Sequence, residues 1–156
     1  MSLASQILDN ATTKGNMIAT AESCTGGMVA SDLTDKPGSS AVMERGFVTY
    51  TNLAKVEMLG VAQSTLDAHG AVSEQVALEM AMGALAHSPA HLAVSITGIA
   101  GPGGSEFKPE GRVCFGIADA TGAVAETIDF GALGRDNIRR AARDHALTLL
   151  LNHLKG

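Results

Sequence analysis

Aromatic residues are nearly absent from this chain of 156 residues, which contains no Trp, one Tyr and four Phe. Proteins that bind single-stranded nucleic acid stack the bases on aromatic side chains, so this class is disfavoured. Basic residues are also scarce, because 11 Lys and Arg stand against 16 Asp and Glu, for a net charge of −5. This acidic balance opposes the basic footprint of nucleic-acid binders. We therefore expect a small-molecule partner and no nucleic acid.

Three further absences bear on where in the cell the protein is expected. No apolar run approaches the roughly 18–20 residues of a membrane span, so no membrane partner is expected. The first residues, MSLASQILDNATTKG, lack the basic region and apolar stretch of a signal peptide. Cys24 and Cys114 are too few and too far apart for a CxxC metal or redox site. A cytoplasmic, reducing location is the default expectation.

What the chain has in excess is glycine, with 18 residues, in a composition that is 46% apolar. The length predicts one domain over 1–156, because no linker, repeat or low-complexity run divides the chain. The core must be built from Ala, Val, Leu, Ile and Met. The glycines are therefore expected to allow particular backbone conformations and not to fill the core.

The apolar pattern predicts helices and strands in the order αβαβαααβββα. Strands separated by helices require crossover connections, whereas the turn at 119–122 predicts an antiparallel hairpin. The chain is therefore expected to form an α/β fold, a three-layer α/β/α sandwich with a mixed sheet of about five strands. Strands are expected at 17–21, 42–50, 91–97, 112–119 and 123–130, and helices from about Leu3, Gly26, Asn52, Ser64, Ser73 and Asp136.

The first candidate site is the segment TAESCTGG (20–27), which follows the first expected strand. Ligands of α/β sheets bind beyond the carboxyl ends of strands. Ser23 and Cys24 are two adjacent nucleophiles there, and a helix N-terminus can activate a thiolate, so the choice between them stays open. Gly26 and Gly27 let a backbone approach closely, and the start of the next helix offers free N–H groups to an anion. An ordinary capped loop is the alternative.

The second candidate site is TGIAGPGGS (97–105), which follows the third expected strand. It nearly matches a phosphate-binding loop, but a glycine stands where the essential Lys belongs, and the GxGxxG pattern also fails. A run of small residues can still cradle one phosphate with its amides. A flexible surface loop is the alternative. The glycines expected to bind phosphate are Gly98, Gly101, Gly103 and Gly104.

A third candidate is Lys55, which falls near the start of a short helix that Asn52 is expected to cap. The positive end of a helix dipole lowers the pKa of a Lys, and a neutral amine can act as a general base. A solvated surface Lys is the alternative. Arg135, Arg139 and Arg143 repeat every four residues, and we interpret them as a solvated basic face of the last helix. Binding of a phosphate or a partner is the alternative.

Five segments together resemble the CinA C-terminal domain family. Its stand-alone members are nicotinamide-nucleotide amidases, and the resemblance runs in order along nearly the whole chain. It implies an α/β/α sandwich that hydrolyses the carboxamide of nicotinamide mononucleotide to nicotinate mononucleotide and ammonia, without a metal or other cofactor. The segments are AESCTGG (21–27), KPGSS (36–40), RGFVTYTNLAKVEMLGV (45–61), HGAVSEQVALEMAMGAL (69–85) and SITGIAGPGG (95–104).

The resemblance places the family's serine nucleophile on Ser23 and its motif tyrosine and lysine on Tyr50 and Lys55. In the mechanism that we expect, Lys55 takes the proton from Ser23 while Tyr50 holds Lys55 or protonates the leaving ammonia. The loop 105–112 departs from the family pattern. A non-catalytic nucleotide- or protein-binding module, connected with competence and DNA damage, is the alternative, and a homo-oligomer is expected. The oxyanion is expected to bind the amides of Thr25, Gly26 and Gly27, and the phosphate those of the glycines in 98–104.

Overall fold

The computed structural model of the protein describes residues 1–156 and contains six α-helices, one short 3₁₀ helix and five strands. The helices are α1 (Leu3–Lys14), α2 (Met28–Leu33), α3 (Asn52–Leu59), α4 (Gln63–His69), α5 (Glu74–Ala86) and α6 (Arg135–Lys155), with the 3₁₀ helix η1 at Ser39–Ala41. The strands are β1 (Ile18–Glu22), β2 (Met43–Val48), β3 (Leu92–Gly98), β4 (Arg112–Asp119) and β5 (Gly122–Asp129).

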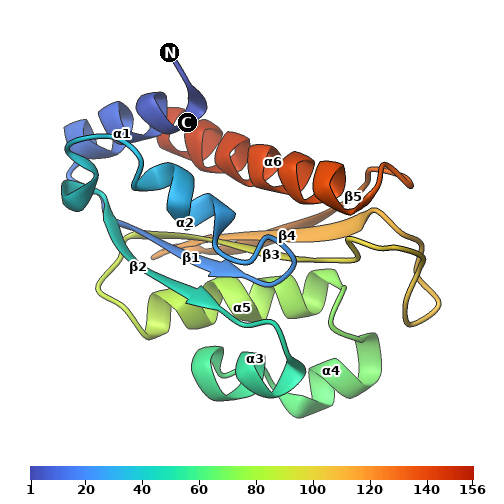
Figure 1. The fold of residues 1–156 in the computed structure, drawn as a ribbon. Helices are drawn as coiled ribbons and strands as arrows, with labels where there is room; N and C mark the ends of the chain where they lie inside the picture. Colours follow the sequence, from blue (N-terminus) through green and yellow to red (C-terminus); the bar gives the residue numbers. More distant parts are fainter.

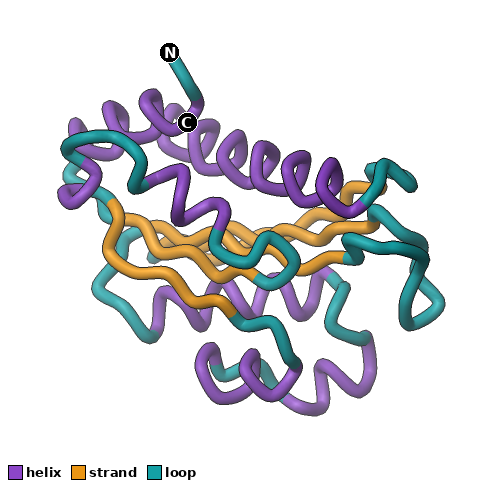
Figure 2. Tube along the Cα trace, viewed as in Figure 1, coloured by secondary structure: helices purple, strands orange, loops and turns teal.

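The five strands form one mixed sheet in the order β2-β1-β3-β4-β5. β1 runs parallel to both β2 and β3, whereas β3, β4 and β5 pair antiparallel in sequence. Helices α1, α2 and α6 cover one face of the sheet and α3, α4 and α5 the other (Figure 1). Figure 2 shows the strands as a single layer between the two layers of helices. The predicted α/β/α sandwich with a mixed five-stranded sheet is confirmed.

The helix boundaries follow local capping groups, with two corrections to the prediction. Thr51, and not Asn52, caps α3, because its hydroxyl accepts a hydrogen bond from Ala54 N at 3.0 Å. Ser64 does not cap α4. A carboxylate from α5 fixes the start of α4 instead, since Glu79 accepts hydrogen bonds from the backbone and hydroxyl groups at 62 and 65.

The core is aliphatic, as the shortage of aromatic residues predicts. A cluster of 22 buried residues fills the space between the sheet and helices α1, α2 and α6. A second cluster lies between the sheet and the α3–α5 layer. Some of the glycine excess serves close packing there, because a Cβ at Gly83 of α5 would lie 1.9 Å from Leu59 O of α3. A Cβ at Gly116 of β4 would lie 2.5 Å from Ala77 O of α5.

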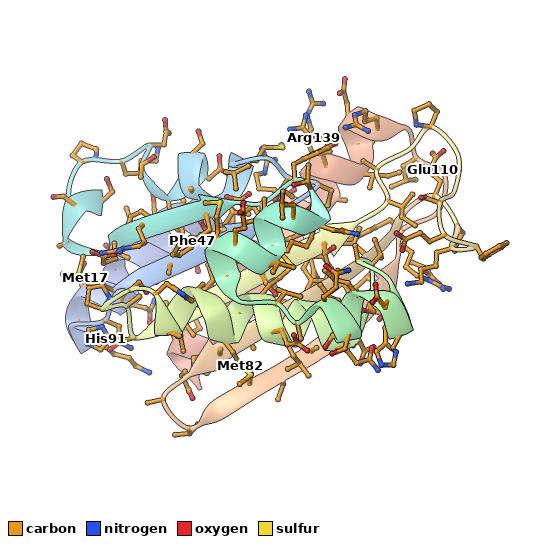
Figure 3. All side chains as sticks on the ribbon, turned by 90° about the horizontal axis from the view of Figure 1, so that it is seen from below. Met17, Phe47, Met82, His91, Glu110 and Arg139 are labelled. Carbon is orange, nitrogen blue, oxygen red and sulfur yellow. The ribbon has the colours of Figure 1, made fainter.

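Different residues lie at the two ends of the strands. Met17 and His91 precede β1 and β3 at one end, where the His91 ring accepts a hydrogen bond from Met17 N at 2.9 Å. Arg139 and Glu110 lie at the opposite end, as Figure 3 shows. This second end carries the carboxyl ends of β1, β2 and β3, and both predicted loop sites lie there. None of the helices combines the length and the apolar character needed to cross a membrane.

Candidate active site

A cavity of about 350 Å³ opens at the carboxyl ends of the parallel strands. It is formed where three connections meet: the one after β1, the one after β2 and the long loop after β3. The sheet register brings these connections together, because β1 is central and parallel to both neighbours. Its walls include Ser23, Tyr50, Lys55, Arg135 and the loop 97–106.

The centre of the cavity is a serine–lysine pair from different elements. Lys55 Nζ, on α3, lies 3.3 Å from Ser23 Oγ, which follows β1. Both side chains are buried, with Lys55 only 2% exposed and Ser23 8%. Lys55 Nζ also donates to Thr49 O at 3.2 Å and contacts Tyr50 O at 3.5 Å. A neutral amine that donates to these two carbonyls directs its lone pair toward the serine hydroxyl.

Burial disfavours the charged form of this lysine. The pKa of Lys55 is lowered, and the main cause is desolvation of the charged form, while the nearby Cys24 and Glu106 act in the opposite direction. The sequence led us to expect a lowered pKa from the helix dipole. The direction agrees, but the principal cause is the removal of water, which depends on packing by other parts of the chain. A neutral amine within reach of a hydroxyl is the arrangement of a general base and its nucleophile.

Cys24 also lines the cavity, but its thiol is in a different state. The side chain is 4% exposed, and burial raises its pKa to about 12. The thiol therefore stays protonated near neutral pH, and only the thiolate is a good nucleophile. Of the two adjacent candidates, the geometry and the electrostatics both favour Ser23.

The start of α2 is already occupied by an anion from the protein itself. The buried carboxylate of Glu22 accepts hydrogen bonds from Thr25 Oγ1 at 2.6 Å, Val29 N at 3.0 Å and Ala30 N at 3.1 Å. The N–H groups of Val29 and Ala30 at this helix start are therefore engaged by Glu22 and are not free for a substrate anion. Glu22 instead fixes the turn that holds Ser23 at the end of β1.

The three residues predicted to bind the oxyanion, Thr25, Gly26 and Gly27, are not among the residues that line the cavity. Gly26 N donates to Ser23 O at 3.0 Å, so this amide is not free. The residue next to the nucleophile is better placed. Cys24 lines the cavity, and its amide donates to no other backbone group.

The phenol of Tyr50 makes no hydrogen bond to Ser23 or Lys55 and bonds to Arg135 instead. Its hydroxyl accepts a hydrogen bond from Arg135 Nη2 at 2.6 Å, and Arg135 Nη1 donates to Gly101 O at 2.6 Å. Tyr50 therefore touches Lys55 through its carbonyl only. Its ring and Arg135 join the β2–α3 connection, the glycine loop and the start of α6 across the cavity.

The predicted phosphate-binding glycines all line the cavity, but they are not equivalent. Gly98 ends β3, where a Cβ would lie 2.7 Å from the Val113 side chain, so packing explains its presence. Gly103 N donates to a carboxylate oxygen of Glu110 at 2.6 Å. The amides of Gly101 and Gly104 are left without a protein acceptor.

Two arginines of α6 are functional candidates that the sequence reasoning assigned to a solvated face. Arg135 lies in the cavity wall, and Arg139 Nε donates to Cys24 O at 3.0 Å behind the nucleophile. Only Arg143 follows the expectation, since it pairs with Asp32 and Asp144. The four-residue spacing places the three on one helix face, but the sequence does not say what that face meets. No group of three His, Cys, Asp or Glu side chains is arranged to hold a metal ion.

Comparison with known proteins decides the family. The sequence model of the CinA C-terminal domain matches residues 1–154. The chain belongs to the CinA C-terminal domain family. This CinA-family chain is 52% identical over 151 residues to the nicotinamide-nucleotide amidohydrolase PncC of Escherichia coli K12, covering 96% of this chain and 92% of that protein. It is 50% identical over 145 residues to a CinA-like protein of Chloroherpeton thalassium, covering 88% of this chain and 34% of that longer protein.

Solved structures agree with this assignment. The competence/damage inducible protein CihA of Agrobacterium tumefaciens superposes with a TM-score of 0.94 at 50% identity, covering 99% of this chain and 94% of that one. A CinA superfamily protein of Escherichia coli superposes with a TM-score of 0.93 at 36% identity, covering 97% and 88% of the two chains. The predicted membership of the CinA C-terminal domain family is confirmed.

Proposed function

We propose that the protein is a nicotinamide-nucleotide amidohydrolase, which converts nicotinamide mononucleotide to nicotinate mononucleotide and ammonia in the recycling of pyridine nucleotides. The observation that carries this proposal is the 3.3 Å separation of Lys55 Nζ and Ser23 Oγ in the cavity. A relative named as an amidohydrolase of this substrate, 52% identical to this chain, supports the choice of nucleotide.

In the proposed first step, neutral Lys55 accepts the proton of Ser23 while the serine Oγ attacks the carboxamide carbon. A tetrahedral oxyanion forms, and the resulting ammonium of Lys55 returns its proton to the departing nitrogen, so ammonia leaves and an acyl-serine remains. In the second step a water molecule attacks the acyl carbon and gives its proton to Lys55. Lys55 then returns this proton to the departing Ser23 Oγ, which regenerates the free serine, and the acid product loses its own proton to give the carboxylate.

We propose that the Cys24 amide, which follows the nucleophile directly and lies in the cavity wall, donates to this oxyanion. Loss of one such donor typically costs about 10²–10³-fold in rate. Thr25, Gly26 and Gly27 have a supporting part in this proposal. They form the turn that Glu22 and Arg139 hold in place.

For the 5′-phosphate we propose the amides of Gly101 and Gly104 together with the guanidinium of Arg135. A guanidinium matches the geometry of a phosphate and binds it through two parallel hydrogen bonds. The hydrogen bonds of Arg135 to Tyr50 and to Gly101 hold its guanidinium at the cavity. Arg135 supplies a positive charge at the cavity itself, so the acidic net charge of the chain does not oppose this assignment.

The proposal is tested by measuring ammonia release from nicotinamide mononucleotide by the purified chain and three variants. Ser23→Ala and Lys55→Ala are expected to abolish turnover, whereas Cys24→Ala keeps it, since the Cys24 thiol stays protonated. Full activity of Ser23→Ala contradicts the assignment of the nucleophile. Thermal stabilisation of the wild type by the nucleotide without any ammonia would instead favour a non-catalytic binding module.

Assembly and location stay predictions that accompany this function. We propose a homo-oligomer in the cytoplasm, acting on a small nucleotide without nucleic acid or membrane partners. Sedimentation equilibrium of the purified chain determines the number of subunits.

A further inference from the structure

The loop beside the cavity contains a turn with an unusual backbone. Ser105 and Lys108 bond to each other in both directions, with Ser105 N to Lys108 O at 3.0 Å and Lys108 N to Ser105 O at 2.8 Å. The two residues between them, Glu106 and Phe107, have φ of 52° and 63°. Two-residue turns with positive φ at both positions normally use Asn and Gly. The backbone of a glutamate is strained at a positive φ, and backbone strain of this kind concentrates at functional sites.

The turn that carries Glu106 is tied to a neighbouring connection of the chain. Lys108 Nζ donates to His69 O and Val72 O, both at 2.6 Å, and this ties the turn to the connection between α4 and α5. The Glu106 carboxylate lies over Gly70, where a Cβ would be only 2.3 Å from its Oε2. The carboxylate therefore lies close to Gly70, whose φ of +76° by itself favours glycine.

The carboxylate of Glu106 is available to a ligand. Glu106 lines the same cavity as the serine–lysine pair, and it takes part in no salt bridge of the structure. Its charge is close enough to oppose the fall in the pKa of Lys55. Arg135 is the guanidinium in the wall of the same cavity. The cavity thus offers one carboxylate and one guanidinium, beside a lysine whose charged form is disfavoured.

These charges match an unusual property of the substrate. The nicotinamide ring of the mononucleotide is a pyridinium cation, and the phosphate at the other end of the molecule is an anion. We propose that Glu106 is a specificity residue that recognises the positive charge of the ring, so the enzyme prefers a cationic pyridinium carboxamide to an uncharged carboxamide of the same shape. This inference rests on the proposed amidase function, and it identifies the positive charge of the ring as the feature of the substrate that the site recognises.

The test compares two nucleotides that differ in ring charge. Nicotinamide mononucleotide is the substrate, and its reduced dihydro form, which has an uncharged ring, is the competitive inhibitor. KM and Ki are measured for the wild type and Glu106→Gln at the same alkaline pH, which favours the neutral form of Lys55 in both. KM of the cationic substrate is expected to rise roughly tenfold, as loss of one nearby unit charge predicts, while Ki of the uncharged analogue stays unchanged. The ratio of Ki to KM therefore falls by the same factor.

Glu57→Gln is the matched control, because Glu57 is an exposed carboxylate on α3 and does not line the cavity. This control is expected to leave the ratio of Ki to KM as in the wild type. An unchanged ratio in Glu106→Gln overturns the proposal, even if both constants rise together, since that result indicates only a structural effect on the loop. If the wild type releases no ammonia, the amidase function fails by itself. Calorimetric titration of both nucleotides into the two proteins then still tests whether Glu106 recognises the ring charge.

Discussion

Replacing Glu22 by Gln tests whether the buried carboxylate organises the nucleophile turn. The carboxylate accepts three hydrogen bonds, from Thr25 Oγ1 and from the amides of Val29 and Ala30. A glutamine keeps one acceptor oxygen but turns its NH₂ group toward one of these donors. One buried donor then loses its partner, at a cost of about 1–3 kcal/mol.

The substitution also removes a negative charge from the positive end of α2, which adds about 0.3–2 kcal/mol. The free energy of unfolding should therefore fall by roughly 2–4 kcal/mol. For a domain of this size each kcal/mol lowers Tm by about 2–4 °C. Because the same turn positions Ser23, kcat should fall about tenfold or more.

Urea unfolding followed by circular dichroism measures the first effect, and ammonia release measures the second. Glu57→Gln removes an exposed carboxylate and serves as the control, with an expected change within about 0.5 kcal/mol. A Glu22→Gln protein as stable as this control would refute the role of the carboxylate at the start of α2. Normal stability with reduced kcat would place its effect on the nucleophile alone.

Two further results are expected from the charges at the cavity. The value of kcat/KM should rise with pH through the lowered pKa of Lys55, since only the neutral amine accepts the Ser23 proton. A pH–rate profile that falls over this range contradicts Lys55 as the base. Arg135→Ala should raise KM for the mononucleotide roughly tenfold, as loss of charge-assisted hydrogen bonds predicts. KM for nicotinamide riboside, which has no phosphate, should not change, and an equal rise for both would count against phosphate binding.

The sequence alone determined the layered architecture and the edge of the sheet where the cavity lies. Short apolar runs separated by helical patterns require parallel strands with crossovers, and the carboxyl ends of such strands meet at one edge. The segments after the first and third strands were therefore recognisable as sites from their polar and glycine residues. Ser73, which caps α5 through a local hydrogen bond, was also predictable.

Only the tertiary structure decided how the residues at that edge work together. Ser23 and Lys55 come from separate connections, so no local rule predicts their 3.3 Å contact. The main reason that the pKa of Lys55 is lowered is desolvation, which packing from distant parts of the chain produces. Packing likewise turned Arg135 toward the cavity and filled the start of α2 with Glu22. Periodicity identifies a helix face, but only long-range contacts determine what that face meets.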